Sequence, residues 1–394
     1  MARYLDRVGN DRFIPAAHDA NYENAPPPPA GDARAALLRQ ALLGARGRVL
    51  QFAKHRDPPP AAPPRAQRSP RTAPRRACAT PFRVLAAPGL RDDFYLDLVC
   101  WSRLDIIAVG LGSRVRLYRA STLKELCDVG IGDAVASLAW SPDGRRLAVG
   151  CASGRIALYD VGRGVVVTPA NGHRGRVGCL DWRGDVLASG SRDRGVACRD
   201  VRVSPRKTVA RWKAHRQEVC GLRWSPGGDA LATGGNDNAV RVWAASKLGA
   251  GAQELQGHGA AVKALAWSPH ARGRLATGGG TADRSIKIWD ASQGLRLSTV
   301  DTGSQVCALA WSSAEDALVS AHGYSLNQIL IWRLPELARD GVLAGHGKRV
   351  LYLALSPDSR VAVTGAGDES LRFWACFGRR RSGPGGLLEC GGIR

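Results

Sequence analysis

Four sets of side chains that could move protons or bind a metal recur along the chain. Each set has a His, then a Ser or Thr, then an Asp that lies six residues before a closing residue. A His beside an Asp could act as a general base or as a pair of metal ligands. A catalytic site normally occurs once, so we interpret these recurring sets as buried polar networks that fix turns. The sets are His173, Ser189, Asp193 and Arg199; His215, Thr233, Asp237 and Trp243; His258, Thr277, Asp283 and Trp289; and His346, Thr364, Asp368 and Trp374.

Other patterns for catalysis or metal binding are missing from the sequence. It contains no Walker-type phosphate loop, no Gly-x-Ser-x-Gly and no C-x-x-C pair, and the run Gly278–Gly280 lies in a repeat turn. The ten Cys are scattered, which fits a reducing compartment. We therefore predict no catalytic residue, no metal site and no cofactor, and expect that the protein is not an enzyme.

The four sets belong to a longer repeat, which predicts the elements that position them. Two markers recur in each unit, and the first recurs at spacings of 39 to 44 residues. A period of this length, with short apolar alternations, is typical of WD repeats, in which each unit forms one four-stranded blade. Seven units predict an all-β, seven-bladed WD-repeat β-propeller, a ring that hides most strand edges. The first markers are Trp101, Trp140, Trp182, Trp224, Trp267, Trp311 and Leu355, and the second are Tyr118, Tyr159, Arg199, Trp243, Trp289, Trp332 and Trp374.

Composition divides the 394 residues into three parts. Residues 1–83 hold 13 of the 22 Pro, with 15 basic and 6 acidic residues, and predict a disordered basic tail. Residues 84–374 contain the repeats and predict the propeller. Residues 375–394 return to tail composition, and we expect them to be flexible.

The formal net charge of +22 favours an acidic partner, such as nucleic acid, a membrane surface or an acidic protein. More than half of this charge lies in the two tails, and the propeller has few aromatic residues beside its Arg, which disfavours nucleic acid. No apolar stretch of about 18 residues exists, and the start of the chain lacks the apolar core of a secretory signal. We therefore expect no membrane partner.

Two short peptides in the tails have the composition of docking segments. The first is DRFIP, which comprises Asp11, Arg12, Phe13, Ile14 and Pro15, and the second is the terminal pair Ile393 and Arg394. No core surrounds them, so their apolar side chains are free to anchor in a partner while the Arg supplies direction.

With these peptides, several loops resemble the Fizzy family, the WD-repeat co-activators of the anaphase-promoting complex, a ubiquitin ligase. DRFIP resembles the family's C-box, and the terminal pair resembles its Ile-Arg tail. The propeller adds Asp92–Leu96 (DDFYL), Gly234–Asn238 (GGNDN), Asp301–Ala308 (DTGSQVCA) and Gly367–Trp374 (GDESLRFW). A segment similar to the family's checkpoint-protein-binding sequence favours the plant mitotic branch over the Fizzy-related branch. It contains Arg48, Val49, Leu50 and Phe52.

The resemblance implies a substrate-recruiting activator that docks on the ligase through its tails and captures degradation signals, or degrons, on its propeller. It also implies three kinds of partner: ligase subunits, substrates such as cyclins and securin-like proteins, and mitotic checkpoint proteins. The implied location is the nucleus and cytoplasm. A Lys-Glu-Asn (KEN) degron would bind Asp93, Phe94, Asn236, Asn238, Thr281, Gln305 and Arg349, and a destruction-box (D-box) degron would bind Leu85 and Glu369.

Departures from the family pattern leave alternatives open. Ala17 stands where the C-box has an Arg, so we predict weakened but measurable docking on the ligase. Ala86 stands where one of two D-box acids is expected, so we predict weaker binding of the Arg of a D-box degron. A diverged paralogue that acts as a scaffold or decoy is the alternative function, with nucleic-acid binding ranked last. Asn236 and Asn238 could instead only shape a turn.

Overall fold

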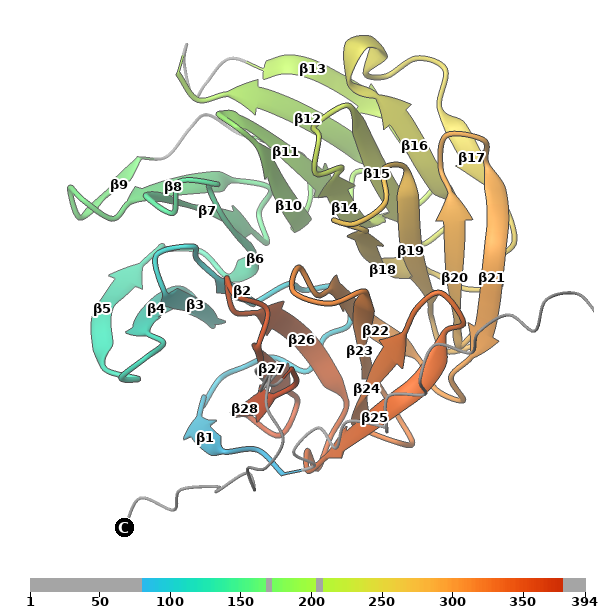
Figure 1. The fold of residues 1–394 in the computed structure, drawn as a ribbon. Helices are drawn as coiled ribbons and strands as arrows, with labels where there is room; N and C mark the ends of the chain where they lie inside the picture. The colour runs from blue at the N-terminus through green and yellow to red at the C-terminus, as the bar shows by residue number, and fades with distance from the viewer. Residues whose placement is uncertain (1–79, 168–171, 203–207, 378–394) are drawn as a thin grey trace, which may run out of the picture. The chain divides into compact units, whose positions relative to one another are not determined.

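The computed structural model describes residues 80–167, 172–202 and 208–377. These residues form seven antiparallel four-stranded sheets arranged around a common axis (Figure 1). The predicted seven-bladed β-propeller is therefore confirmed. A single turn of 3-10 helix, Ala245–Lys247, is the one helical element of the described ranges. No helix in these ranges is long and apolar enough to cross a membrane.

The blades are numbered here in chain order. Blades 1 to 3 contain β2 (Val99–Trp101), β3 (Ile106–Leu111), β4 (Arg114–Arg119) and β5 (Glu125–Gly130); β6 (Val135–Trp140), β7 (Arg146–Cys151), β8 (Ile156–Asp160) and β9 (Val165–Val167); and β10 (Val177–Arg183), β11 (Val186–Ser191), β12 (Gly195–Asp200) and β13 (Thr208–Lys213). Blades 4 and 5 contain β14 (Val219–Trp224), β15 (Ala230–Gly235), β16 (Val240–Ala244) and β17 (Gln253–Leu255); and β18 (Val262–Trp267), β19 (Arg274–Gly279), β20 (Ser285–Asp290) and β21 (Leu295–Asp301). Blades 6 and 7 contain β22 (Val306–Trp311), β23 (Ala317–His322), β24 (Gln328–Arg333) and β25 (Ala338–Ala344); and β26 (Val350–Leu355), β27 (Val361–Ala366), β28 (Ser370–Ala375) and β1 (Arg83–Ala86).

The first strand of the chain closes the ring. Strand β1 pairs with β28, with Arg83 opposite Phe373 and Ala86 opposite Ser370, so the chain's first strand is the outer strand of its last blade. The pairing covers an edge of β28 that would otherwise expose backbone donors and acceptors.

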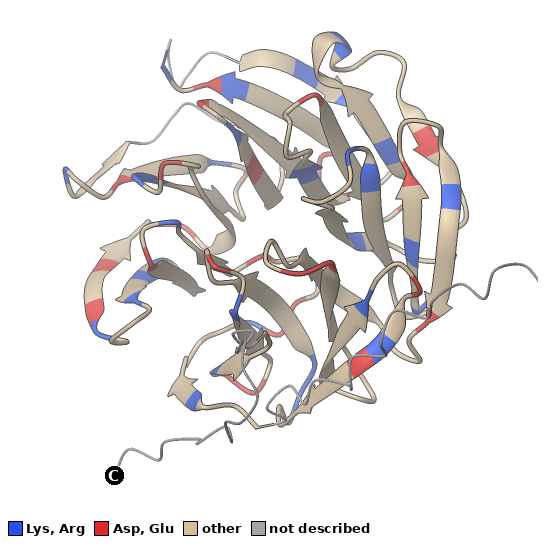
Figure 2. Ribbon diagram, in the orientation of Figure 1, with Lys and Arg blue, Asp and Glu red and all other residues tan. Residues whose placement is uncertain are grey.

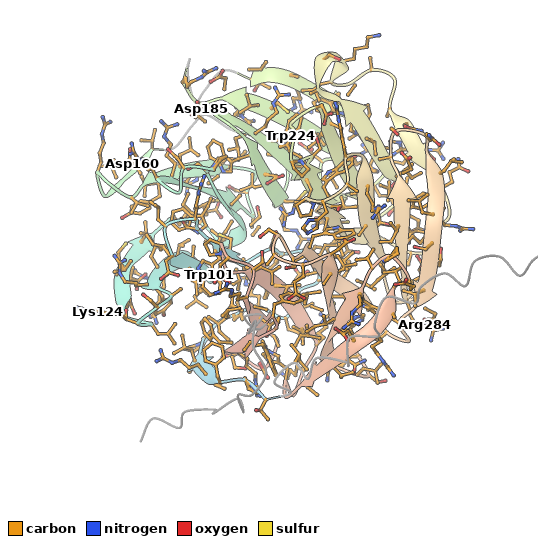
Figure 3. All side chains as sticks on the ribbon, viewed as in Figure 1. Trp101, Lys124, Asp160, Asp185, Trp224 and Arg284 are labelled. Atoms are coloured by element: carbon orange, nitrogen blue, oxygen red, sulfur yellow. The ribbon has the colours of Figure 1, made fainter. Side chains whose placement is uncertain are left out.

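Tryptophans at the first marker position join neighbouring blades. The indole N–H of Trp182 donates to Ala139 O at 3.1 Å, and the indole N–H of Trp311 donates to Ala266 O at 2.9 Å. In both cases the acceptor lies on the innermost strand of the preceding blade. The repeat spacing thus marks contacts between blades as well as strand ends. The packed side chains fill the space between the sheets, while Lys124 and Arg284 lie at the outer margin (Figure 3).

The recurring polar sets form the predicted buried networks. In blade 4, His215 Nδ1 lies 2.9 Å from Asp237 Oδ1, and its Nε2 lies 2.9 Å from Thr233 Oγ1. The indole N–H of Trp243 donates to the same Thr233 oxygen at 3.0 Å. Burial by itself raises the pKa of Asp237, but hydrogen bonds from His215 and from the backbone of Arg216 lower it well below its usual range. The carboxylate thus stays ionised and holds the turn.

Blade 6 carries a version of the network that the sequence pattern did not reveal. Here His322, on strand β23, contacts Ser320 Oγ at 2.7 Å through Nε2, and Trp332 donates to the same oxygen at 2.7 Å. Burial lowers the pKa of His322 to about 4, so this imidazole is neutral. His322 lies on strand β23, whereas its counterparts lie in the links that precede the innermost strand of each blade, so counting from the closing Trp does not find it.

Candidate peptide-binding face

A segment between β1 and β2 passes over one end of the ring and contacts several blades. Asp97 donates its backbone N–H to Ala136 O in blade 2 at 3.0 Å and accepts from Leu138 N at 2.9 Å. Lys263 Nζ of blade 5 donates to Leu96 O at 2.7 Å. These bonds fix the backbone of the segment on the ring, so the positions of its side chains are fixed as well.

Most of the predicted KEN residues lie at this same end. In each antiparallel blade, the turn between the second and third strands and the link to the next blade fall at one end of the strands. Asn236, Asn238 and Thr281 occupy turns of the first kind, and Gln305 and Arg349 lie in links of the second kind. The residues come from blades 4 to 7, which are separate in sequence.

Asp93 is held by a cation from blade 3. Its Oδ2 accepts from Arg176 Nη1 at 2.9 Å, and its Oδ1 accepts from the backbone of Tyr95 at 2.9 Å. Arg176 also pairs with Glu218 at 3.0 Å. Burial raises the pKa of Glu218, and the Arg176 charge opposes that rise. Asp93 is therefore a fixed acceptor that already shares one cation.

Asn236 is oriented by Tyr95. The Tyr95 hydroxyl donates to Asn236 Oδ1 at 2.9 Å, and Asn236 Nδ2 donates to Gln217 Oε1 at 2.7 Å. Gly178 of blade 3 makes this approach feasible, because a Cβ at that position would lie 2.9 Å from Tyr95 O. Asn236 retains a second amide hydrogen and a second carbonyl lone pair for a ligand.

Arg349 is paired with Asp92 rather than left open. Its Nη2 donates to Asp92 O at 2.9 Å, and its Nε contacts the Asp92 carboxylate. The guanidinium also lies 5.7 Å from the ring centre of Tyr324, which is exposed. A peptide carboxylate that binds Arg349 must therefore share the cation with Asp92.

The remaining predicted KEN residues differ in accessibility. Phe94 and Gln305 are only 7% and 9% exposed, and the Phe94 ring packs edge to face on Tyr95. Thr281 is exposed. Asn238 has a left-handed φ of 63°, which agrees with a role in shaping its turn. The structure thus gives Phe94 a packing role and leaves Thr281 open to solvent.

The two predicted D-box residues lie close together in blade 7. Leu85 on β1 pairs with Leu371 on β28. Glu369, in the turn before β28, accepts from Gly89 N through its carboxylate at 3.2 Å. Ala86 lies next to Leu85 on the same strand and is exposed, so the site retains one of the two expected acids.

Several predicted residues fall outside the described ranges. They are Asp11, Arg12, Phe13, Ile14, Pro15, Ala17, Arg48, Val49, Leu50, Phe52, Ile393 and Arg394. Their roles in docking and checkpoint binding stay predictions. Within residues 80–377, apart from the two omitted segments, no group of three or more His, Cys, Asp or Glu side chains is placed to hold a metal ion.

Sequence reasoning missed the residues that orient the site. Tyr95 stood inside the DDFYL segment and was visible as a hydroxyl next to two predicted residues. Arg176 carried no comparable signal, and Asp92 lay in the same segment without any sign of its partner, because Asp93 and Arg349, to which they bond, lie more than 80 residues away. The contacts depend on the ring closing, and spacing along the chain does not encode them.

Comparison with known proteins identifies the family. A family model described as the CDC20/Fizzy WD40 domain matches residues 85–374, which is most of the chain. The chain belongs to the CDC20/Fizzy family. The family prediction made from the tail motifs and loops is therefore confirmed.

Relatives in several organisms support this membership. The chain is 48% identical to the B-type cell cycle switch protein ccs52A of Medicago truncatula, covering 80% of this chain and 66% of that relative. It is 43% identical to Protein FIZZY-RELATED 2 of Arabidopsis thaliana, covering 94% and 83%. It is 44% identical to the APC/C activator protein CDH1 of Saccharomyces cerevisiae, covering 78% and 54%. The chain thus spans just under two thirds of the length of the ccs52A relative.

A solved structure matches the propeller at similar identity. A chain in the crystal structure of the mitotic checkpoint complex superposes with a TM-score of 0.74 and 42% identity, covering 77% of this chain and 94% of that chain. The curated relatives carry Fizzy-related, ccs52 and CDH1 names, whereas the structure is of a mitotic assembly. Assignment of this family member to the mitotic branch stays a prediction.

Proposed function

We propose that this CDC20/Fizzy member is a substrate-recruiting activator of the anaphase-promoting complex and is not itself an enzyme. The observation that carries the proposal is the convergence of Asp93, Asn236 and Arg349, from separate parts of the chain, at one end of the ring. Fixed amide, carboxylate and guanidinium groups can hydrogen-bond to an extended peptide that carries Lys, Glu and Asn. A relative named as an APC/C activator supports the assignment.

The proposed mechanism is recruitment by tethering. The tails dock on the ligase through DRFIP and the terminal Ile-Arg pair, and the propeller holds a degron. Joining the two sites raises the local concentration of substrate at the ligase without any chemistry on the propeller itself. Cyclins and securin-like proteins are the proposed substrates, mitotic checkpoint proteins are further proposed partners, and the nucleus and cytoplasm are the proposed locations.

Reconstituted ubiquitination tests the function directly. The full-length protein is added to purified ligase and a substrate with a KEN or D-box degron, and chain formation is measured. We expect stimulation that falls when residues 11–15 are removed or when Asn236→Ala and Arg349→Ala are combined. Failure to stimulate with wild-type protein, although a known activator works in the same assay, would exclude the function.

The alternative is a scaffold or decoy with weakened docking, and the features that favour it are Ala17, Ala86 and Arg199. Affinity capture of ligase subunits distinguishes the two functions. We expect the wild-type protein to capture the ligase measurably and the Ala17→Arg variant to capture more. If only the variant binds, the wild-type protein is better described as a decoy that holds substrates away from the ligase.

A further inference from the structure

One side of the propeller concentrates basic side chains, most of which no ion pair neutralises. Lys and Arg occur around the whole ring (Figure 2), but on blade 3 they cluster at the end that carries the peptide-binding face. We call this cluster the blade 3 basic patch. It consists of the exposed side chains of Arg174, Arg192, Arg194, Arg211 and Lys213.

The acids near the patch are already occupied. Asp193 contacts His173 Nδ1 at 3.1 Å, accepts from the backbone of Arg174 at 3.0 Å and pairs with Arg211 at 3.2 Å. Glu218 pairs with Arg176. Among the described residues, Arg174, Arg192, Arg194 and Lys213 have no acidic side chain within ion-pair distance, so their charges face solvent.

Three hollows connect the patch to the peptide-binding face. The first, about 450 Å³, is lined by Tyr95, Asn236, Arg192 and Arg194. The second, also about 450 Å³, shares Arg192 with the first. The third, about 710 Å³, shares Arg192 with the second and ends at Arg211, Trp212 and Lys213. A peptide that contacts Asn236 can therefore continue over blade 3 along a basic surface.

We propose that the blade 3 basic patch binds an anionic segment, phosphorylated or rich in Asp and Glu, that flanks a degron held at the neighbouring face. The proposal rests on the proposed function, because the degron places the flank. A peptide fits better than nucleic acid, since Asp193 and Glu218 interrupt the positive surface. The exposed aromatic side chains among the described residues, Phe82 and Tyr324, lie in blades 7 and 6, away from the patch.

Five labelled peptides and the full-length protein test the proposal by fluorescence anisotropy. Four of them combine a KEN sequence, intact or scrambled, with an eight-residue flank that is either neutral or rich in Asp and Glu. A fifth peptide carries two phosphoserines in an otherwise neutral flank beside the intact KEN sequence. We expect the anionic flank to strengthen binding of the intact peptide about tenfold, with the gain falling as salt rises.

The matched variants differ only in where three charges are removed. The test variant carries Arg174→Ser, Arg192→Ser and Arg194→Ser. The control carries Arg103→Ser, Arg145→Ser and Arg163→Ser, three exposed positions in turns at the opposite end of the strands. We expect the test variant to lose the gain from the anionic flank and to bind the neutral-flank peptide as wild type does. The control should retain the gain, and thermal unfolding should show both variants folded.

Each outcome bears on one proposal. The proposal for the blade 3 basic patch is overturned if peptides with anionic and neutral flanks bind equally well. It is also overturned if the gain in affinity from the anionic flank persists in the test variant. Tighter binding of a single-stranded oligonucleotide than of any peptide, lost in the same variant, would replace it with a nucleic-acid site. If the scrambled peptide with an anionic flank binds through the patch while the intact neutral peptide does not bind, the degron site fails and the patch stands. The phosphoserine peptide shows which anion is preferred.

Discussion

Blades 3 and 4 hold their turns with the same bonds but present different chemistry. In blade 3 the turn reads Arg192, Asp193, Arg194, and in blade 4 it reads Asn236, Asp237, Asn238. The central Asp bonds to a buried His in both, at 3.1 Å and 2.9 Å. The third residue takes a left-handed φ in both, 70° and 63°.

The comparison separates what holds the scaffold from what recognises a ligand. The His and Asp are enclosed and fix the turn, while the residues on either side of the Asp face outward. One blade therefore offers amides that suit peptide backbone and side-chain amides, and its neighbour offers cations that suit anions. Changing the flanking positions alters recognition without altering the network below them.

The closing residues of the two networks also differ. Trp243 in blade 4 donates one hydrogen bond to Thr233 and packs edge to face on Trp212, with ring centres 5.5 Å apart. Arg199 in blade 3 donates to Ser189 Oγ at 3.1 Å and to Gly172 O at 3.0 Å. Burial lowers the pKa of Arg199, and the charge of Arg211 lowers it further. The Arg replaces the indole donor, but its cation is buried and it makes no aromatic packing contact of this kind.

Truncating Trp243 should have the largest effect. The Trp243→Ala change removes a buried ring, its packing on Trp212 and the hydrogen bond to Thr233, so we expect a loss of about 3–5 kcal/mol in the free energy of unfolding. Urea denaturation followed by far-UV circular dichroism measures it. If Trp243→Ala lowers the free energy of unfolding less than Arg199→Ala does, the closing Trp of blade 4 does not stabilise its network more than the closing Arg of blade 3.

Acid should destabilise the propeller in part through His322 in the polar network of blade 6. The pKa of His322 is about 4 in the folded protein and about 6.5 when unfolded. The unfolded state therefore binds an extra proton between these values, so stability falls as the pH is lowered through that window. The contribution lost by pH 4 is about 3 kcal/mol.

A His322→Asn variant isolates this contribution. Its free energy of unfolding should fall less steeply than that of wild type between pH 6.5 and pH 4, although the variant is less stable at neutral pH. Identical slopes for the two proteins would show that another group accounts for the acid sensitivity.

Much of the scaffold could be predicted from the sequence because it repeats. A residue type that returns every 39 to 44 positions identifies the blades, and the recurrence of His, Thr and Asp in one order identifies their networks. Blade 6 was missed because its His322 lies on strand β23 and not in the link before the blade, where it still reaches a Ser that accepts from the closing Trp. Pattern matching finds equivalent positions and cannot find equivalent bonds made from new positions.

The candidate site was predicted less completely, for a physical reason. Resemblance supplied Asp93, Asn236 and Arg349, and the structure places all three at one end of the ring. It did not supply their intramolecular partners, Arg176 and Asp92, which set how much charge remains for a ligand. Such pairs depend on side-chain positions across blades, which no single repeat contains.

Truncating the closing Arg of blade 3 should cost less than truncating the Trp. The Arg199→Ala change loses two charged hydrogen bonds, but it also removes a cation whose burial is unfavourable. We expect a net loss of about 1–2 kcal/mol in the free energy of unfolding. The same urea titration measures it, and Arg199→Lys serves as the control that keeps charge without the fork of donors. If Arg199→Ala lowers the free energy of unfolding as much as Trp243→Ala does, interactions beyond the two hydrogen bonds must stabilise the buried Arg199 cation.

The smallest effect, and the sharpest contrast between the two turns, is expected at their third position. Arg194 has a φ of 70°, a conformation that Asn adopts more readily than Arg because its short side chain bonds locally. Arg194→Asn should therefore raise the free energy of unfolding by about 0.5–1 kcal/mol, and Asn238→Arg should lower it by a similar amount. If Arg194 is retained for an anionic ligand, the same Arg194→Asn protein should bind the anionic-flank peptide more weakly while being more stable. A variant that gains stability and keeps its full preference for that peptide would show that Arg194 takes no part in recognition, and that the difference between the two turns carries no chemistry at this position.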